Sequence, residues 1–203
     1  YTIDYRTNVI PYSRGTESLL GYTQEEFDIK LIFNDYLHPL QRPILHILIN
    51  IVAHLGATKA IFNDSYLSVI HKVRHKKGHY ITVLRKARIL EGDKNGKLIT
   101  GISVLTDMTS LVSTEAVTWK IVSPNFDPTE LKHLIDEQIK TFFSRRELEI
   151  LNEIKKGRSS QKTGEKLHIS KHTVDTHRRN MLKKTGAKNT VELLKFATLN
   201  NIL

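Results

Sequence analysis

The sequence predicts two parts of different fold class: an α+β domain, in which an antiparallel sheet carries helices on one face, followed by an all-α module of four helices. Two observations separate them. The apolar residues change from helical spacing to strict alternation at Tyr66 and keep that alternation through three segments. After Thr129, every segment has helical spacing and helix-capping residues. The 203 residues are enough for each part to bury a core of its own.

The charge is divided as unevenly as the fold. Residues 139–203 carry 15 Lys and Arg against 6 Asp and Glu, a net charge of +9, whereas residues 1–138 carry 16 against 15. A strongly basic module behind a nearly neutral one is typical of a polyanion-binding tail joined to a regulatory or catalytic domain. The alternative is a charged surface that serves solubility alone.

The composition excludes several classes of protein. The chain has no cysteine, which excludes disulfides, cysteine-ligated zinc, iron–sulfur clusters and a thiol nucleophile, and fits a reducing compartment. The longest apolar stretch, Ile44–Leu55, has 12 residues, whereas a bilayer-spanning helix needs about 20. No secretory signal is visible, although a chain that begins at Tyr1 without an initiator Met leaves a trimmed leader open. We therefore expect a cytoplasmic protein without a membrane partner.

Helices are expected ahead of the sheet. Thr23–Glu26 has the spacing of a capping box, with a hydroxyl and a carboxylate three residues apart. The apolar residues of Ile44–Leu55 recur at helical spacing, which predicts an amphipathic helix facing the core. Pro39 and Pro43 bracket the start of this helix, and we expect Gly56 to end it.

Three long strands are predicted next, at 66–73, 80–90 and 98–106. Lys76–Gly78 and Gly92–Gly96 have the composition of the turns that join them. Consecutive strands joined by tight turns form an antiparallel meander. On the first strand, alternation places four side chains on one face: Leu67, Val69, His71 and Val73.

Residues 113–140 are expected to connect a first domain, 1–112, to a second, 141–203. Val117–Val122 could add one more strand, and residues 129–140 have helical spacing. A helix between two domains suits dimer contact or signal transfer, and a passive spacer is an equal alternative.

The tail predicts a helix-turn-helix. Its first helix follows the capping box Ser144–Glu147. Two further helices meet at Leu167–Ser170, where the turn is brief and Gly164 removes a side chain from their close approach. Gly186 is expected to end the third helix, and Asn189–Glu192 begins a fourth.

The third helix has the chemistry of a helix that binds the major groove. From Lys171 to Lys188 it contains six basic residues and one acid. Arg can hydrogen-bond guanine twice, Asp can accept from cytosine, and Thr can contact a polar edge or the thymine methyl. The candidate base-contacting residues, on the face away from Val174, are His172, Asp175, Thr176 and Arg179. Further along the helix, Lys183 and Lys184 are candidates for phosphate contacts.

The motifs of the tail carry a family resemblance. They are S-R-R-E-L-E-I-L at 144–151, G-R-S-S-Q-K at 157–162, and L-H-I-S-K-H-T-V-D-T-H-R-R-N-M-L-K-K-T-G at 167–186. Residues 144–203 thus resemble the LuxR-type (GerE) helix-turn-helix domain of bacterial transcription regulators.

This resemblance implies roles for single residues. Base contacts would come from Asp175, Thr176 and Arg179, and dimerisation on DNA from the helix 190–199. Residues that match the family's phosphate contacts are Thr173, His177, Lys183 and Lys162. The sequence departs from the family at Thr163-Gly164, where a large aliphatic residue and Ala are usual, and at Thr185, where Leu is usual. We expect these departures to loosen the packing slightly.

The front part resembles a PAS sensor domain over residues 1–112. The motifs that carry this are G-Y-T-Q-E-E-F at 21–27, H-P-L-Q-R at 38–42, V-R-H-K-K-G-H-Y at 73–80 and G-I-S-V-L-T-D-M-T at 101–109. The resemblance implies a domain that senses a small molecule, a redox state or a partner. Leu40-Gln41 replaces the family's usual acidic pair, which leaves the ligand open, and with it whether there is one. No cofactor is therefore named.

Some histidines could ligate haem or zinc, but their positions in the sequence do not favour such a site. His46 or His54, on the long helix before the sheet, could offer a haem ligand, but both lie on its polar side, so surface histidines are the preferred interpretation. A zinc site at the hairpin of His71, His75 and His79 lacks an apparent fourth ligand. No metal site and no catalytic constellation are predicted, and we do not expect an enzyme.

The sequence therefore favours a bacterial transcription regulator that binds double-stranded DNA as a homodimer under the control of its PAS-like domain. One alternative is a signalling module that docks on a kinase through that domain, for which an exposed apolar sheet face without an internal cavity would be diagnostic. Another is a factor associated with RNA polymerase. The chain contains no receiver domain, so control would come from the PAS-like domain, another protein or a missing segment.

Overall fold

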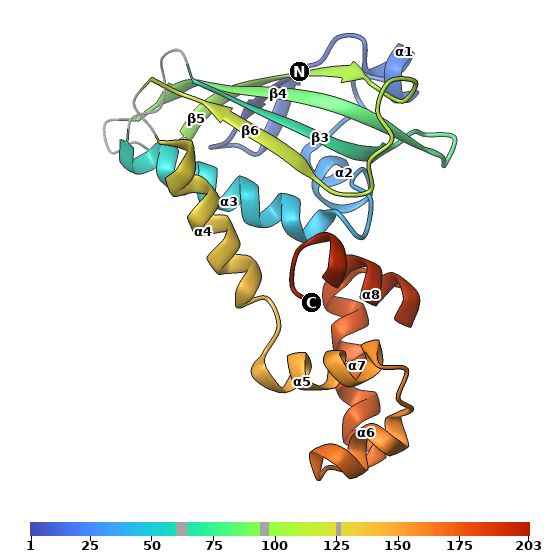
Figure 1. Cartoon of the computed structure of the whole chain (residues 1–203). Helices are drawn as coiled ribbons and strands as arrows, with labels where there is room; N and C mark the ends of the chain where they lie inside the picture. The colour runs from blue at the N-terminus through green and yellow to red at the C-terminus, as the bar shows by residue number, and fades with distance from the viewer. Residues whose placement is uncertain (60–64, 94–97, 125–126) are drawn as a thin grey trace. The chain divides into compact units, whose positions relative to one another are not determined.

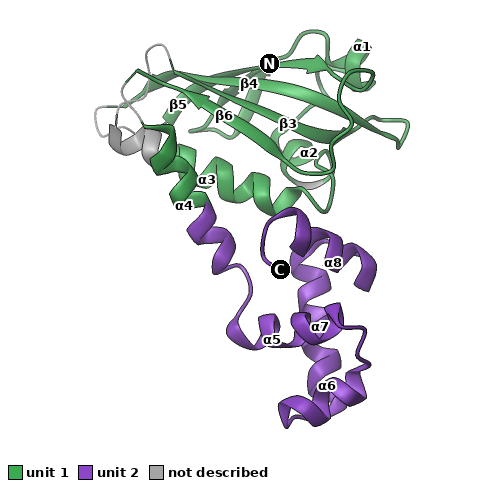
Figure 2. Cartoon of the chain, viewed as in Figure 1, with its two compact units in different colours: residues 1–135 green, residues 136–203 purple. Residues whose placement is uncertain are grey.

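The computed structural model describes residues 1–59, 65–93, 98–124 and 127–203. The chain divides into two compact units, residues 1–135 and 136–203 (Figure 2). The predicted turn at Gly92–Gly96 lies mostly outside the described residues, as do two residues of the Pro124–Pro128 segment.

Unit 1 is built on a six-stranded antiparallel sheet (Figure 1). The strands are β1 (Thr2–Asp4), β2 (Val9–Tyr12), β3 (Tyr66–Arg74), β4 (Tyr80–Gly92), β5 (Leu98–Asp107) and β6 (Thr118–Val122), in the order β2-β1-β5-β4-β3-β6. The predicted meander is β3-β4-β5, and the predicted additional strand is β6, which pairs with β3. The two short strands at the start of the chain, β1 and β2, were not predicted. They extend the sheet beyond β5: β1 pairs with β5, and β2 pairs with β1.

Three helices connect β2 to β3: α1 (Thr16–Leu20), α2 (Ile29–Asn34) and α3 (Arg42–Lys59). Figure 1 shows α2 and α3 on one face of the sheet. Leu45 and Leu48 of α3 are buried on the side that faces the strands. The α+β class, an antiparallel sheet with helices on one face, is therefore confirmed.

Two details of these helices differ from the prediction. The α3 helix continues through Gly56 to Lys59, because a glycine inside a helix costs only about 1 kcal/mol and does not end it. The capping box forms, with the Thr23 amide donating to Glu26 Oε2 at 3.0 Å, but it closes a single turn. The next helix, α2, begins at Ile29 with Asp28 as its cap.

Gln41 fixes the start of α3 against the sheet. Its side chain is buried, accepts a hydrogen bond from the amide of Lys72 at 2.6 Å and donates one to the carbonyl of Glu115 at 3.0 Å. The amide thus joins the helix, β3 and the segment after β5, at a position where the PAS pattern has an acidic residue. A neutral amide can both donate and accept, as these two partners require.

Unit 2 is helical. After α4 (Pro128–Lys140), which begins in unit 1, the helices are α5 (Arg145–Lys155), α6 (Ser160–Leu167), α7 (Lys171–Thr185) and α8 (Thr190–Leu199). A side-chain oxygen caps each of the last four, from Ser144, Ser159, Ser170 and Asn189. Their apolar faces form one core of Ile150, Leu151, Val174, Met181, Leu193 and Phe196. The predicted four-helix module is confirmed.

The turn between α6 and α7 explains one departure from the LuxR pattern. His168 adopts a left-handed conformation with φ of 53°, and the Ile169 amide donates back to the carbonyl of Gly164 at 3.0 Å. A Cβ atom on Gly164 would lie 2.6 Å from the backbone oxygen of Ile169. The two helices therefore approach more closely here than an alanine would allow. At the other departure, Thr185 is buried and its hydroxyl donates to the carbonyl of Met181 at 2.8 Å.

We expect Gly164→Ala to destabilise unit 2 by about 1–3 kcal/mol, because a backbone atom blocks the added methyl group and the turn must move. Urea unfolding followed by far-UV circular dichroism measures this. Gln161→Ala, at an exposed position of the same helix, is the control. Equal stability of the two variants would contradict the close approach.

Candidate functional site

The α7 helix presents the predicted base-contacting residues away from its buried side. Val174 and Met181 are fully buried, whereas His172 and Arg179 are exposed. Asp175 and Thr176 are partly exposed beside them. The structure thus brings the four candidates together on the outer part of one helix, immediately after the turn.

Two contacts order this outer part. Arg179 Nη2 donates to the hydroxyl of Thr176 at 3.2 Å, which places a guanidinium and a hydroxyl side by side. A hydrogen bond from Ser160 lowers the pKa of Asp175, and the charges of Lys171 and Arg178 act in the same direction. Asp175 is therefore an ionised acceptor that α6 and the first turn of α7 hold in place.

The predicted phosphate contacts lie in different surroundings. Lys162 and Lys183 are exposed, His177 is partly exposed, and Thr173 lies within 2.8 Å of the capping hydroxyl of Ser170. Lys184 differs: its Nζ lies 3.1 Å from Glu147 Oε2 and 5.4 Å and 5.6 Å from the ring centroids of Phe142 and Phe143. Its ammonium thus already has a carboxylate and two aromatic rings as neighbours, which compete with a phosphate contact.

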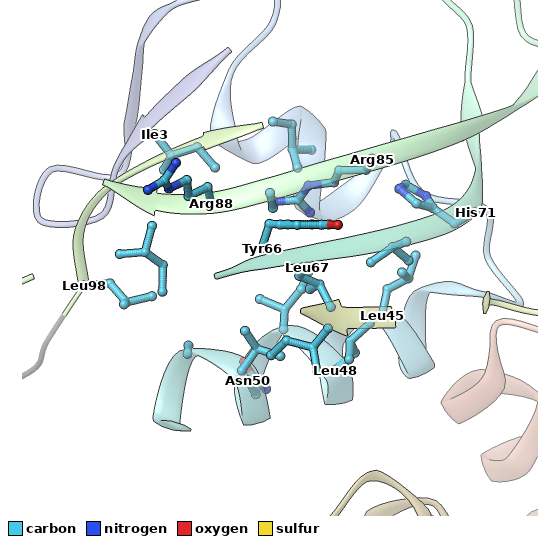
Figure 3. Close-up of a pocket in the computed structure, with 18 of the residues that line it drawn as sticks. Ile3, Leu45, Leu48, Asn50, Tyr66, Leu67, His71, Arg85, Arg88 and Leu98 are labelled. Carbon is cyan, nitrogen blue, oxygen red and sulfur yellow. The ribbon is translucent and has the colours of Figure 1, made fainter. Parts of the chain in front are cut away.

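Unit 1 contains a cavity of about 230 Å³ between the inner face of the sheet and helices α2 and α3 (Figure 3). Most of its lining is aliphatic, including Leu45 and Leu48 of α3. Three of its polar side chains come from different elements: Tyr36 follows α2, His71 lies on β3 and Arg85 lies on β4. An apolar cavity with a few converging polar groups has the general form of a small-molecule site.

His71 is 1% exposed, and neither of its ring nitrogens has a hydrogen-bond partner among the described residues. Burial, and secondly the charge of Arg85, lower the pKa of His71 to about 3. The imidazole is therefore neutral in the folded protein. The alternation along the strand predicted that His71 shares a face with Leu67, Val69 and Val73, but it did not connect His71 with a cavity.

The other histidines considered for cofactors lie outside the cavity. Neither His46 nor His54 lines the cavity: His46 is half-buried beside Phe33, and His54 is exposed. His75 and His79 stack on each other at the hairpin, with ring centroids 4.5 Å apart. Within the described part of the chain, no three residues of His, Cys, Asp or Glu gather as a metal site would require.

Comparison with known proteins identifies the helical unit. Residues 141–197 match the family model described as bacterial regulatory proteins, luxR family. These residues are a LuxR-family helix-turn-helix domain. A transcriptional regulatory protein of Bacillus subtilis, YxjL, is 33% identical over 84 residues, which are 41% of this chain and 38% of the relative. The chain thus matches well under half the length of this relative.

Solved structures also resemble the chain. The N-terminal domain of a diguanylate cyclase with a PAS/PAC sensor, from Marinobacter aquaeolei, matches 54% of this chain and 93% of its own length, with 17% identity and a TM-score of 0.41. A VqmA–ligand–DNA complex from Vibrio cholerae matches 98% of this chain and 81% of that one, with 18% identity and a TM-score of 0.34. Among the helices described, none is both long and apolar enough to span a bilayer.

Two residues that organise the LuxR-family domain were not found from the sequence. Arg178 donates from Nη1 to Ser160 at 3.0 Å and from Nη2 to Thr190 at 2.8 Å, and so joins α6, α7 and α8. Glu153, only 4% exposed, accepts from Lys156 at 3.1 Å and Lys166 at 2.9 Å and also contacts Arg158. No local motif marks either residue, because their partners are brought close only by the packing of the helices.

The buried His71 predicts a pH dependence of stability. The imidazole titrates near pH 6.5 in the unfolded chain and near 3 in the folded one, so between these values the unfolded state binds more protons. The contribution of the neutral imidazole to the free energy of unfolding is complete above pH 6.5. It is lost as the pH falls, and the loss is about 2 kcal/mol between pH 6.5 and pH 5.

Urea unfolding monitored by Trp119 fluorescence tests this, since the single Trp119 lies on β6 of unit 1. His71→Leu should remove most of this loss, whereas the exposed His54→Gln should keep it. A pH dependence unchanged in His71→Leu would show that His71 is not held neutral.

Proposed function

We propose that this chain is a bacterial transcription regulator in which unit 1 senses a signal and the LuxR-family domain binds double-stranded DNA in the cytoplasm as a homodimer. The α7 helix carries the proposal: it follows a tight helix-turn-helix junction and exposes His172, Arg179 and Lys183 while its opposite side is buried. This is the arrangement in which a recognition helix enters the major groove. The B. subtilis relative, which bears the name of a transcriptional regulatory protein, supports the same function.

The residues of α7 divide between base and phosphate contacts in this proposal. Arg179, held beside Thr176, hydrogen-bonds a guanine, and Asp175 accepts from a cytosine amino group. His172 adds a contact at the start of the helix. The proposed phosphate contacts are Lys162, Thr173, His177 and Lys183. Lys184 makes a smaller contribution, because its ammonium already pairs with Glu147.

The cavity of unit 1 supports sensing rather than simple docking. A module that acted only by docking on a kinase or RNA polymerase would need an apolar surface and no internal space. Unit 1 instead encloses about 230 Å³ lined by residues of its helices and sheet. For the dimer, α8 offers Val191, an apolar residue that is 75% exposed.

Binding to duplex DNA should weaken steeply as salt rises, because several phosphate contacts release counterions from the DNA. The slope of log K against log salt measures this effect for the full chain, and we expect it to correspond to several released ions. The net charge of +9 on residues 139–203 is the physical basis. A slope near zero would contradict DNA binding altogether.

Base and phosphate contacts can be separated with two variants. Arg179→Ala should cost about 1–3 kcal/mol on the cognate duplex and relax the preference at one base pair. Lys183→Ala should weaken cognate and scrambled duplexes about equally and reduce the salt slope by about one. Fluorescence anisotropy on both duplexes measures these effects.

Lys184→Ala is the matched control for Lys183→Ala, since the two lysines are adjacent and only Lys184 pairs with Glu147. We expect it to lower the stability of the domain and to change the salt slope less. Equal losses on the two duplexes for Arg179→Ala would remove its role in base recognition.

A further inference from the structure

The lining of the cavity in unit 1 includes a guanidinium that forms no ion pair with a carboxylate of the described residues. Arg85 lies on the inner face of β4, and its guanidinium stays ionised at any ordinary pH. Its Nε donates to the hydroxyl of Ser103 at 3.1 Å. Among the described residues no carboxylate forms an ion pair with Arg85, and the groups that act on its charge are tyrosines. By contrast, the buried Glu153 of unit 2 has three cations around it.

A charge in a largely apolar cavity is costly when no counterion is close to it, so the position of the partly buried Arg85 indicates a group that arrives from outside. Guanidinium offers two parallel N–H donors, which match the two oxygens of a carboxylate. This geometry makes an anion with a planar pair of oxygens the natural complement of Arg85.

Two further polar groups in the same cavity also lack partners. The Tyr36 hydroxyl and both ring nitrogens of His71 are buried and have no hydrogen-bond partner within the described ranges. In the sheet, Val69 is opposite Arg85 and Val83 is opposite His71, so the two polar side chains are diagonal neighbours on one face. Figure 3 shows Arg85 and His71 on these neighbouring strands, with Leu45 and Leu48 of α3 across the cavity.

The charges around the cavity favour an anionic ligand. His71 is neutral, and burial raises the pKa of Tyr36 well above its usual value, so the phenol remains a donor without charge. The lining contains two arginines, Arg85 and Arg88; Arg88 is exposed, whereas Arg85 is the one that neighbours His71 across the strands. A largely apolar lining suits a monocarboxylate better than a doubly charged phosphate.

The opposite wall, formed by α3, determines which chemical group the rest of the ligand can carry. This wall is mostly aliphatic, with Asn50 as its polar residue, and a cavity of about 230 Å³ compares with the roughly 150 Å³ apolar cavity that holds benzene. The body of the ligand is therefore apolar and about the size of a substituted ring or a short hydrocarbon chain.

We propose that unit 1 binds a small apolar monocarboxylic acid, whose carboxylate pairs with Arg85 and whose hydrocarbon part lies against α3. The inference deepens the proposed function, on whose sensor role it rests. Tyr36 donates a hydrogen bond to the acid, and His71 offers a second polar contact. The signal that the regulator responds to would then be the concentration of such an acid.

Isothermal titration of the full chain with benzoate, phenylacetate and hexanoate, each against its primary amide, tests this directly. At least one acid should bind, about tenfold or more tighter than its amide, because the amide lacks the charge-assisted hydrogen bonds. In the unmodified chain, amide NMR shifts on addition of that acid should concentrate on β3, β4 and β5. Equal binding of acid and amide, shifts confined to unit 2, or no binding by any of the three acids would overturn the proposal.

Arg85→Met separates a ligand contact from a structural role. Since it removes a charge that has no carboxylate partner among the described residues, we expect the free variant to be at least as stable as the parent chain while its preference for acid over amide disappears. Lys86→Met, on the exposed face of the same strand, is the matched control and should keep the preference. An acid preference that survives Arg85→Met would overturn the role of Arg85. Should this variant fail to fold, the NMR result on the parent chain decides.

DNA affinity measured on the same samples distinguishes this inference from the proposed function. A chain that binds DNA but none of the acids overturns only the ligand. A chain that binds an acid but no DNA supports the ligand and contradicts the regulator.

Discussion

The fold of unit 1 depends on the register of β3 and β4. A strand cannot turn one side chain outward without turning all of them, because alternate residues face opposite sides. Leu67, Val69 and Val73 must be buried beneath α3, and this requirement carries His71 into the interior with them. On β4, the same constraint that buries Val83 directs Arg85 inward. The polar part of the cavity is thus a consequence of the same pairing that forms the core.

The polar side chains that line the cavity, His71, Tyr36 and Arg85, keep donors or acceptors that can contact a ligand. His71 stays neutral, and Tyr36 retains its hydroxyl proton, so neither adds charge to the cavity. The Nε atom of Arg85 donates to the Ser103 hydroxyl, which orients the guanidinium without neutralising it. In our proposal, such a site folds without a ligand and is stabilised further when an anionic ligand binds.

In the LuxR-family domain, adjacent residues of a helix have different surroundings and therefore different roles. Successive residues of a helix are about 100° apart, so one of an adjacent pair can face the core while the other faces solvent. Arg178 joins three helices, whereas Arg179 is exposed beside Thr176. Lys183 and Lys184 are both exposed, but Lys184 pairs with Glu147. Part of the positive charge of the tail therefore stabilises the domain and is not free for DNA.

The sequence by itself determined the features that local patterns carry. Alternation and turns predicted β3, β4 and β5, and capping residues predicted the helices of the tail, because these signals depend on neighbours along the chain. The LuxR motifs also identified the helix that we propose to contact DNA.

Other features required the tertiary structure. Of the two short strands at the start of the chain, β1 pairs with distant β5 and β2 pairs with β1. The α3 helix passes through Gly56 because its packing outweighs a weak local preference. The partners of Arg178, Lys184 and Glu153, and the absence of a carboxylate partner for Arg85 in the described chain, depend on residues far apart in sequence. Only folding brings such residues to within a few ångströms of one another, so no pattern of neighbouring residues can reveal them.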